Sequence, residues 1–539
     1  MSNKTPTIDA VTLGVFKHLV LAIPEEMGAN LRRTAFSPNI KERLDESCAL
    51  FDAKGRLIAQ AEHIPVHLGA MPSAVKAVMN DFPKLNPGDQ VIVNDPYRGG
   101  SHLPDITLIA PFFWQGKLKG YAVNRAHHAD VGGKIPGSMP GFSSMLSEEG
   151  IIISPTLFAR NGIIQKNVLK LFQDSTRNPQ ERIGDLNAQR GANSLGVSRC
   201  TDFIRRYGEQ AFDGFVEAII GYAARRVKTY MSSNLPKGES SATDYLDGQD
   251  HPIPISVRIR LFADSFEADF SKTAPQHHGN ANAPLSVTQS AVYYVLRCLL
   301  PDDIPPNHGC YESVRIIAPK GSLVNPVAPA AVSSGNVETS QRIVDVLLLA
   351  LNDLLPGKIP AQAQGTMNNL SIGWKTKTYY ETIAGGMGAT SKKDGASAVQ
   401  VHMTNTANTP TEALETTYPL QVVKTALRES SGGCGLNSGG LGVTREILFL
   451  EDAQVSIQSE RRKFPPKGAA GGGNGKCGSN SLRYVDGSTV ELPGRCTIEV
   501  KKGQSIIIDT PGGGGWGRPN LPAIPHSNTD NQANHRERS

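Results

Sequence analysis

Two histidines and an aspartate, His102, Asp105 and His127, are the residues whose types could most readily do chemistry. Imidazole nitrogens and carboxylate oxygens bind divalent metals, and three protein ligands leave coordination positions for water and substrate, as catalytic sites require. A purely structural interpretation also fits, in which His102 caps a turn, Asp105 accepts backbone N–H bonds and His127 is an ordinary polar residue. The elements around the three residues must decide between these interpretations.

A predicted β-hairpin brings the three residues together. The segments on both sides of the Gln-Gly dipeptide at 115–116 are rich in strand-forming residues. If the turn is centred on this dipeptide, we expect His127 to lie opposite Pro104. His102 and Asp105 would then lie on either side of Pro104 along the facing strand. His128 would then point to the opposite face of the strand, although a one-residue slip would exchange the two histidines.

Further polar and flexible residues surround the same strand ends, where functional groups tend to lie. They are Asn94, Asp95, Gly99, Gly100, Arg125, His128 and Asp130. Asp45 is another candidate carboxylate, but the sequence alone does not place it near the hairpin, and a surface charge is the simpler interpretation. The neighbourhood favours a metal site over a turn cap.

The rest of the chain predicts a mixed α/β (α+β) fold. Apolar residues spaced three or four apart from Thr7 to Leu31 indicate an N-terminal helix with a kink or break at Pro24. Residues 340–355 are apolar nearly all round and predict a buried central helix. The remaining predictions are hairpin strands at 47–52 and 56–60, a strand at 90–93, an irregular surface loop at about 136–150, helical structure between 158 and 226, and a strand-like segment at 257–270.

The length of 539 residues exceeds the size at which one core usually stops growing, so we expect two or three packed regions. We predict an N-terminal metal-site region at 1–240 and a central α/β region at 241–384. A glycine-rich, β-containing C-terminal region at 385–517 and a disordered tail at 518–539 complete the division.

Composition and charge exclude several classes of protein. The net charge of +5 is small and its basic residues are scattered, so nucleic-acid binding is not indicated. The seven cysteines form no CxxC pair, which argues against a disulfide framework and a structural zinc site. No signal peptide is recognised and no segment approaches the roughly 18 apolar residues of a membrane span. We therefore expect a cytoplasmic protein that does not bind membranes.

Glycine clusters at 385–388, 432–442, 468–475 and 512–517 have two interpretations. Glycine lets backbone N–H groups approach a phosphate closely. However, Ala470 and Cys477 occupy the positions where a P-loop around Gly475-Lys476 needs Gly and Ser or Thr. We therefore interpret the clusters as glycine-rich turns between strands.

Long motifs in the sequence closely resemble those of the hydantoinase B/oxoprolinase family. The two longest are NDPYRGGSHLPD at 94–105 and NRAHHADVGG at 124–133. Shorter ones follow at 136–140, 334–342, 402–406, 431–433, 461–466 and 510–515. The resemblance covers nearly the whole chain except its two ends.

The resemblance implies a subunit of an ATP-dependent hydrolase that opens the C–N bond of cyclic amides such as hydantoins, 5-oxoproline or lactams. Members of the family pair with a hydantoinase A-type subunit, or are fused to it, and ATP and Mg²⁺ bind to that partner. The family's metal ligands correspond to His102, Asp105 and His127, with Asp45 as a fourth. The metal would be zinc or manganese, since nitrogen and oxygen ligands do not decide between them. A hetero-oligomer, such as a dimer of heterodimers, is expected.

The implied mechanism has two stages. The partner would phosphorylate the amide oxygen, after which metal-activated water would attack the former carbonyl carbon. His128, Asp130 or His67 would move protons, and the sequence does not choose among them.

Two alternatives remain open from the sequence. One is a subunit of an ATP-dependent carboxylase of ketones such as acetone or acetophenone, in which the metal would hold the activated substrate or bicarbonate. The other is a non-catalytic scaffold that stabilises its ATP-using partner.

Overall fold

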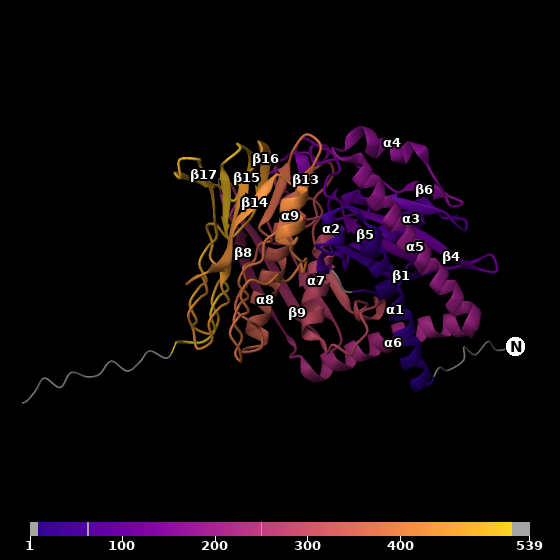
Figure 1. Ribbon diagram of the computed structural model, residues 1–539. Helices are drawn as coiled ribbons and strands as arrows, with labels where there is room; N and C mark the ends of the chain where they lie inside the picture. Colours follow the sequence, from indigo (N-terminus) through magenta and orange to yellow (C-terminus); the bar gives the residue numbers. More distant parts are fainter. Residues whose placement is uncertain (1–8, 62–63, 250, 520–539) are drawn as a thin grey trace, which may run out of the picture.

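The computed structural model describes residues 9–61, 64–249 and 251–519 (Figure 1). Helices alternate with mostly antiparallel strands, which confirms the mixed α/β fold expected from the sequence. In Figure 1 the N-terminal sheet lies at one end of the molecule and the C-terminal strands at the other, with α7 (Leu285–Leu299) and α8 (Ser340–Leu354) between them. The tail predicted at 518–539 lies, from residue 520 onward, outside the described residues.

The first sheet contains seven strands in the order β2-β1-β5-β4-β3-β6-β7. Their bounds are β1 (Glu46–Asp52), β2 (Leu57–Gln60), β3 (Gln90–Val93), β4 (Asp105–Trp114), β5 (Lys117–His127), β6 (Thr156–Arg160) and β7 (Ile163–Ile164). Adjacent side chains of a strand point to opposite faces, so Cys48 and Leu50 pack under the long helices while Ala49 and Phe51 pack under α3 (Ala70–Asp81). The sheet is therefore buried on both faces.

Three long helices cover one face of this sheet. They are α1 (Ala10–Thr34), α5 (Pro179–Tyr207) and α6 (Glu209–Asn234). The break expected at Pro24 is wrong, because α1 runs through that residue. Proline removes only one intrahelical hydrogen bond, and Pro24 is itself buried on the face that packs against the sheet and α5. Two shorter helices, α2 (Pro38–Lys41) and α4 (Lys166–Ser175), lie in the same part of the chain.

The predicted hairpin is present as β4 and β5, but its register differs by one residue from the expected one. The ladder shifts at Lys119, which is the extra residue of a β-bulge near the turn. Every pair beyond the bulge moves by one position. His127 consequently pairs with Asp105 and not, as expected, with Pro104.

A second sheet of four strands packs against α7 and α8 around the largest apolar core. Its order is β11-β10-β9-β8, from β8 (Gly238–Leu246), β9 (Ile253–Leu261), β10 (Phe266–Asp269) and β11 (Val314–Ile317). The buried central helix predicted at 340–355 is α8, which is preceded by one turn of π-helix at Gly335–Thr339.

Two further sheets pack face to face in the C-terminal region, which confirms its predicted β-rich character. One has the order β13-β12-β16-β19, from β12 (Asn369–Gly373), β13 (Thr378–Thr382), β16 (Ala453–Gln458) and β19 (Arg495–Val500). The other has the order β14-β15-β20-β17-β18, from β14 (Leu420–Arg428), β15 (Gly442–Phe449), β17 (Ser479–Arg483), β18 (Thr489–Leu492) and β20 (Ser505–Asp509). A short helix, α9 (Thr411–Thr417), precedes β14.

The segment at 136–150 is irregular, as predicted, but it does not lie wholly on the surface. Residues 137–141 are buried. Gly141 approaches the backbone of Cys496 so closely that a Cβ atom there would lie 2.5 Å from the Cys496 carbonyl carbon. This segment therefore connects the N-terminal sheet to the C-terminal region.

The glycine clusters form what we call the glycine array, the segments 385–388, 432–442, 468–475 and 512–517. Their backbones hydrogen-bond to one another, for example from Gly433 N to Gly513 O at 2.8 Å and from Gly515 N to Gly473 O at 2.9 Å. A Cβ atom on Gly439 would lie 1.9 Å from Gly513 O. The turn interpretation is therefore incomplete, because close packing of backbone on backbone is what excludes side chains here.

Among the described residues, no helix combines the length and the apolar character needed to cross a membrane.

We predict that Gly439→Ala lowers the free energy of unfolding by about 1–3 kcal/mol, since the new methyl group overlaps the facing carbonyl. Gly14→Ala is the matched control, because Gly14 lies in α1 with no atom within 4 Å of its added Cβ. That change should raise stability by up to about 1 kcal/mol through helix propensity. Denaturant unfolding measures the stability of both variants. A Gly439→Ala midpoint equal to that of the wild type would contradict the proposed crowding.

Candidate metal centre

The open end of the β4–β5 hairpin places the three predicted ligands together. Asp105 is the first residue of β4 and His127 the last of β5, and the two are direct partners in the ladder. Side chains of paired residues point to the same face. His102 lies in the preceding turn, where its carbonyl accepts a hydrogen bond from Asp105 N at 3.1 Å. The turn is tight because Gly100 lies against Asn94, whose carbonyl oxygen would be 2.2 Å from an added Cβ.

One ligand atom from each of His102, Asp105 and His127 lies within 4.8 Å of the other two. His102 Nε2 is 3.2 Å from Asp105 Oδ1, and the two imidazole rings have centroids 5.0 Å apart. All three residues are at most 3% exposed. A single ion could therefore contact all three side chains away from bulk solvent.

Asp45 and His67 lie at the same small cavity as the three residues. Asp45 directly precedes β1, and its carbonyl accepts a hydrogen bond from His127 N at 3.0 Å, which continues the β1–β5 ladder. His67 ends the 3-10 turn Pro65–His67, and its Nε2 is 3.6 Å from Asp105 Oδ2. Asp45 is thus near the group of three without belonging to it.

Unpaired ring nitrogens show that the cavity is suited to an ion. Both nitrogens of His102, Nε2 of His127 and Nε2 of His67 are buried without a hydrogen-bond partner among the described residues. Each buried polar atom left in this state costs about 1–3 kcal/mol. A divalent ion would accept one lone pair from the His102 ring and one from the His127 ring, so the residues present fit a metal.

The other ring nitrogens and carboxylate oxygens are held by neighbouring side chains. Asn39 Nδ2 lies 3.1 Å from His127 Nδ1, and Ser47 Oγ lies 2.8 Å from His67 Nδ1. Ser101 Oγ donates to Asp105 Oδ2. Such partners fix the orientation of the rings.

Tyr380, from β13, completes the wall beside His127. The two rings stack with centroids 4.6 Å apart and an interplanar angle of 10°. The Arg43 guanidinium lies over the other side of Tyr380, 4.9 Å from the ring centroid, and Arg43 Nη1 donates to Tyr380 O. Through this stack, the N-terminal sheet contacts the sheet that contains β12 and β13 at the cavity.

The protonation states favour metal binding. Burial alone would raise the pKa of Asp105, but the neighbouring His102 and His67 hold it well below its usual range. Burial and the nearby His102 lower the pKa of His127 well below its usual value. Burial raises the pKa of Asp45 to about 6, with the Asp105 charge adding to the effect and Arg43 opposing it. An ionised carboxylate and a neutral imidazole are the forms that ligate metals.

Two residues predicted to move protons lie elsewhere. His128 points to the opposite face of the sheet, as expected from strand alternation, and its Nε2 is 2.9 Å from Gln189 Oε1 on α5. Asp130 accepts hydrogen bonds from the backbone of Gly132 and Gly137 and pairs with Arg177 at 2.8 Å. Neither lines the cavity, whereas His67 does.

Sequence reasoning missed several residues of the cavity. Asn39 and Tyr380 carry no local signal, because only the tertiary fold brings them there. Asn336, on the π-helical turn, lines the cavity with a buried Oδ1 that has no hydrogen-bond partner. Its position inside the motif at 334–342 was the available signal, and single π-helical turns often occur at functional sites.

Comparison with protein families agrees with the geometry. The family model described as hydantoinase B/oxoprolinase matches residues 9–519. The chain belongs to the hydantoinase B/oxoprolinase family.

Individual relatives include proteins of two lengths. The chain is 44% identical over 534 residues to 5-oxoprolinase 1 of Arabidopsis thaliana, covering 94% of this chain and 42% of that protein. It is 31% identical over 539 residues to a protein of a Pseudomonas species named as a D-/L-hydantoinase B-type subunit, covering 95% and 90% respectively. The chain thus spans less than half the length of the 5-oxoprolinase and nearly all of the hydantoinase B-type relative.

Two solved structures share the fold over most of the chain. One is an ATP-dependent caprolactamase from Pseudomonas jessenii, with a TM-score of 0.90, 27% identity and coverage of 96% of this chain and 93% of that one. The other is an acetone carboxylase in its nucleotide-free form, with a TM-score of 0.87, 17% identity and coverage of 95% and 76%.

We predict that His102→Ala and His127→Ala each remove most of the bound metal, because each deletes one of three clustered ligands. His308→Ala is the control, since His308 lies outside the cavity. Elemental analysis of the purified variants measures the metal, with circular dichroism to verify folding. Near-stoichiometric metal in both ligand variants would place the ion elsewhere.

Asn39→Ala should weaken metal binding about 10–100-fold without removing a ligand, because Asn39 orients the His127 ring. Competition with a chelating dye measures the dissociation constant. Asn187→Ala, on the exposed side of α5, is the matched control. Equal affinity in both variants would show that the Asn39 contact does not support metal binding.

Proposed function

We propose that the chain is the metal-bearing part of an ATP-dependent hydrolase that opens cyclic amides. The observation that carries this proposal is the group of three buried side chains with unpaired ring nitrogens at one cavity. Membership in the hydantoinase B/oxoprolinase family supports the substrate class. The likeness to the caprolactamase and the 5-oxoprolinase supports it further, since both of their names describe action on a ring amide.

In this proposal His102, Asp105 and His127 hold a divalent ion, with Asp45 beside them as a fourth ligand. Zinc or manganese bound there would lower the pKa of water towards about 7 and polarise a carbonyl oxygen. Asn39 and Ser101 keep the ligands oriented, and Tyr380 with the surrounding apolar side chains keeps bulk water out. The ion and its ligands therefore act in a site of low polarity, where charges interact strongly.

His67 is the residue we propose for proton transfer. Its ring contacts the cavity, its Nδ1 is fixed by Ser47, and its Nε2 faces Asp105 without a hydrogen bond. A neutral imidazole in that place can take a proton from water and pass it to the ring nitrogen that leaves. His128 and Asp130 do not line the cavity, so we do not assign this role to them.

We propose that ATP and Mg²⁺ bind to a hydantoinase A-type partner. The 5-oxoprolinase relative is more than twice as long as the part that aligns with this chain, whereas the hydantoinase B-type relative aligns over 90% of its length. This pattern fits a catalytic unit that is divided between two subunits in one case and fused in the other. The partner would activate the amide oxygen by phosphorylation before water attacks.

A carboxylase subunit is the second candidate. The acetone carboxylase shares the fold at 17% identity, a likeness that supports the fold alone. A hydrolase is favoured because the relatives above 25% identity that are named for a reaction on a small molecule act on ring amides or hydantoins.

We predict that His102→Ala lowers ATP-dependent ring opening at least 100-fold when the chain is combined with its A-type partner, because metal chemistry is lost while ATP binding remains. Hydantoin and 5-oxoproline are assayed separately, with complex formation verified by size-exclusion chromatography. His308→Ala should retain wild-type activity.

The same experiment separates the alternatives. Nearly intact activity in an assembled His102→Ala complex would support the scaffold. Incorporation of labelled bicarbonate into a ketone by the wild-type complex, without ring opening, would support the carboxylase.

A further inference from the structure

The metal cavity is too small to hold a ring. Its free volume is about 20 Å³, and a single water molecule already needs about 10–15 Å³ on the same measure. The candidate ligands that line it are at most 6% exposed. A substrate whose carbonyl reaches the ion must therefore have most of its atoms in an adjoining space.

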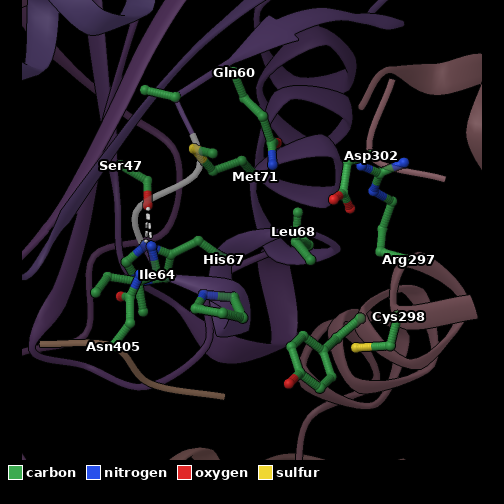
Figure 2. A pocket seen from close by; sticks show the side chains of 13 residues that line it. Ser47, Gln60, Ile64, His67, Leu68, Met71, Arg297, Cys298, Asp302 and Asn405 are labelled. Atoms are coloured by element: carbon green, nitrogen blue, oxygen red, sulfur yellow. Dashed lines mark hydrogen bonds between the residues drawn. The ribbon is translucent and has the colours of Figure 1, made fainter. Parts of the chain in front are cut away.

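Such a space adjoins the metal cavity on the side of His67. We call it the side chamber; its volume is about 310 Å³, and its wall is drawn in Figure 2. This volume lies at the lower end of the range found for small-molecule sites. Ile64 and His67 line both spaces, so the two spaces share part of their walls.

Two chain segments pass through this shared wall with neighbouring residues on opposite sides. Asp45 faces the metal cavity and Ser47 the side chamber. Thr404 faces the metal cavity and Asn405 the side chamber. Figure 2 shows Ser47, Ile64 and His67 together at this wall, where Ser47 Oγ accepts a hydrogen bond from Ile64 N and contacts His67 Nδ1.

The lining of the side chamber combines apolar side chains with polar and charged ones, among them Gln60, Arg297 and Asp302. Ile64, Leu68 and Met71 provide apolar contact for a small ring. Gln60, the last residue of β2, is 6% exposed, and its Oε1 is buried with no hydrogen-bond partner in the part of the chain that the structure describes. Leaving that oxygen unpaired costs free energy that a ligand N–H would recover.

Ring amides match this lining chemically. A lactam or hydantoin ring forces its amide into the cis form, so that N–H and C=O lie on the same edge. Gln60 Oε1 can accept a hydrogen bond from the N–H group of that edge, which leaves the carbonyl oxygen for the ion. A ligand without an N–H group would leave Gln60 Oε1 unpaired and would bind less well.

We propose that the side chamber is the binding site for the ring of a cyclic amide, with Gln60 as the residue that recognises its N–H group. The ring lies against Ile64, Leu68 and Met71, and His67 forms the boundary across which the carbonyl reaches the metal cavity. This inference rests on the proposed function for the identity of the ligand. It adds a binding site and a specificity-determining residue.

The test uses the full chain in complex with its partner, and hydantoin and 5-oxoproline as probes. Calorimetry without ATP measures binding, and steady-state assays with ATP measure KM and kcat. Gln60→Met keeps the side-chain length and removes the amide. We expect its Kd and KM to rise about 10-fold, the size of one net hydrogen bond, with kcat and metal content little changed. Gln454→Met, at the one partly exposed position of strand β16, is the matched control.

A second variant keeps the proposal falsifiable if Gln60→Met fails to fold. Cys298 is exposed and lines the side chamber, so Cys298→Trp should fill the space and weaken binding of both probes at least 10-fold. Val423→Trp, at a residue that is 51% exposed on β14, controls for the added indole.

Each outcome has a distinct meaning. Wild-type affinity in both the Gln60 and Cys298 variants, or no binding of either probe by the wild-type complex, would overturn the side chamber as the binding site. Binding that weakens in both variants supports it. If that weakening is observed but the wild-type complex opens neither ring with ATP, the proposed hydrolase function fails while the binding site stands.

Discussion

The candidate site depends above all on the backbone ladder of β5, which pairs with β4 on one side and β1 on the other. His127 ends this strand, so its two neighbours in the sheet are Asp105 and the backbone of Asp45. The bulge at Lys119, at the far end of the hairpin, sets that register. Without the bulge His127 would face Pro104, and the carboxylate of Asp105 would point to the other face of the sheet.

A buried site of this kind is costly to the apo protein, and its surroundings show how the fold tolerates it. Four imidazole nitrogens at the cavity have no partner, yet each ring except that of His102 is fixed through its other nitrogen. The Arg43–Tyr380–His127 stack adds rigidity from a distant sheet. Because one ligand atom from each of His102, Asp105 and His127 lies within 4.8 Å of the other two, one ion would contact all three side chains, and binding it would stabilise the folded state by mass action.

Several features of the candidate site were predictable from local sequence patterns. Strand-forming residues around a Gln-Gly turn were enough to place His102, Asp105 and His127 together, and strand alternation separated His127 from His128. The bulge was not predictable, because one inserted residue near the end of a strand leaves no change in apolar pattern. Asp45 needed the family resemblance. Asn39 and Tyr380 were not predictable from local patterns. Asn39 lies 88 residues from His127 in the sequence, and Tyr380 reaches His127 from a strand of another sheet.

The glycine array and the metal cavity illustrate opposite uses of close packing. In the array, backbone approaches backbone so closely that the glycine positions leave no room for side chains. At the cavity, large side chains from the hairpin, the Pro65–His67 turn, the π-helical turn and β13 meet and leave room for little more than one water molecule. A reaction at such a point cannot enclose its substrate there. The carbonyl alone must reach the ion, so selectivity for the rest of the substrate has to come from the walls of an adjoining space.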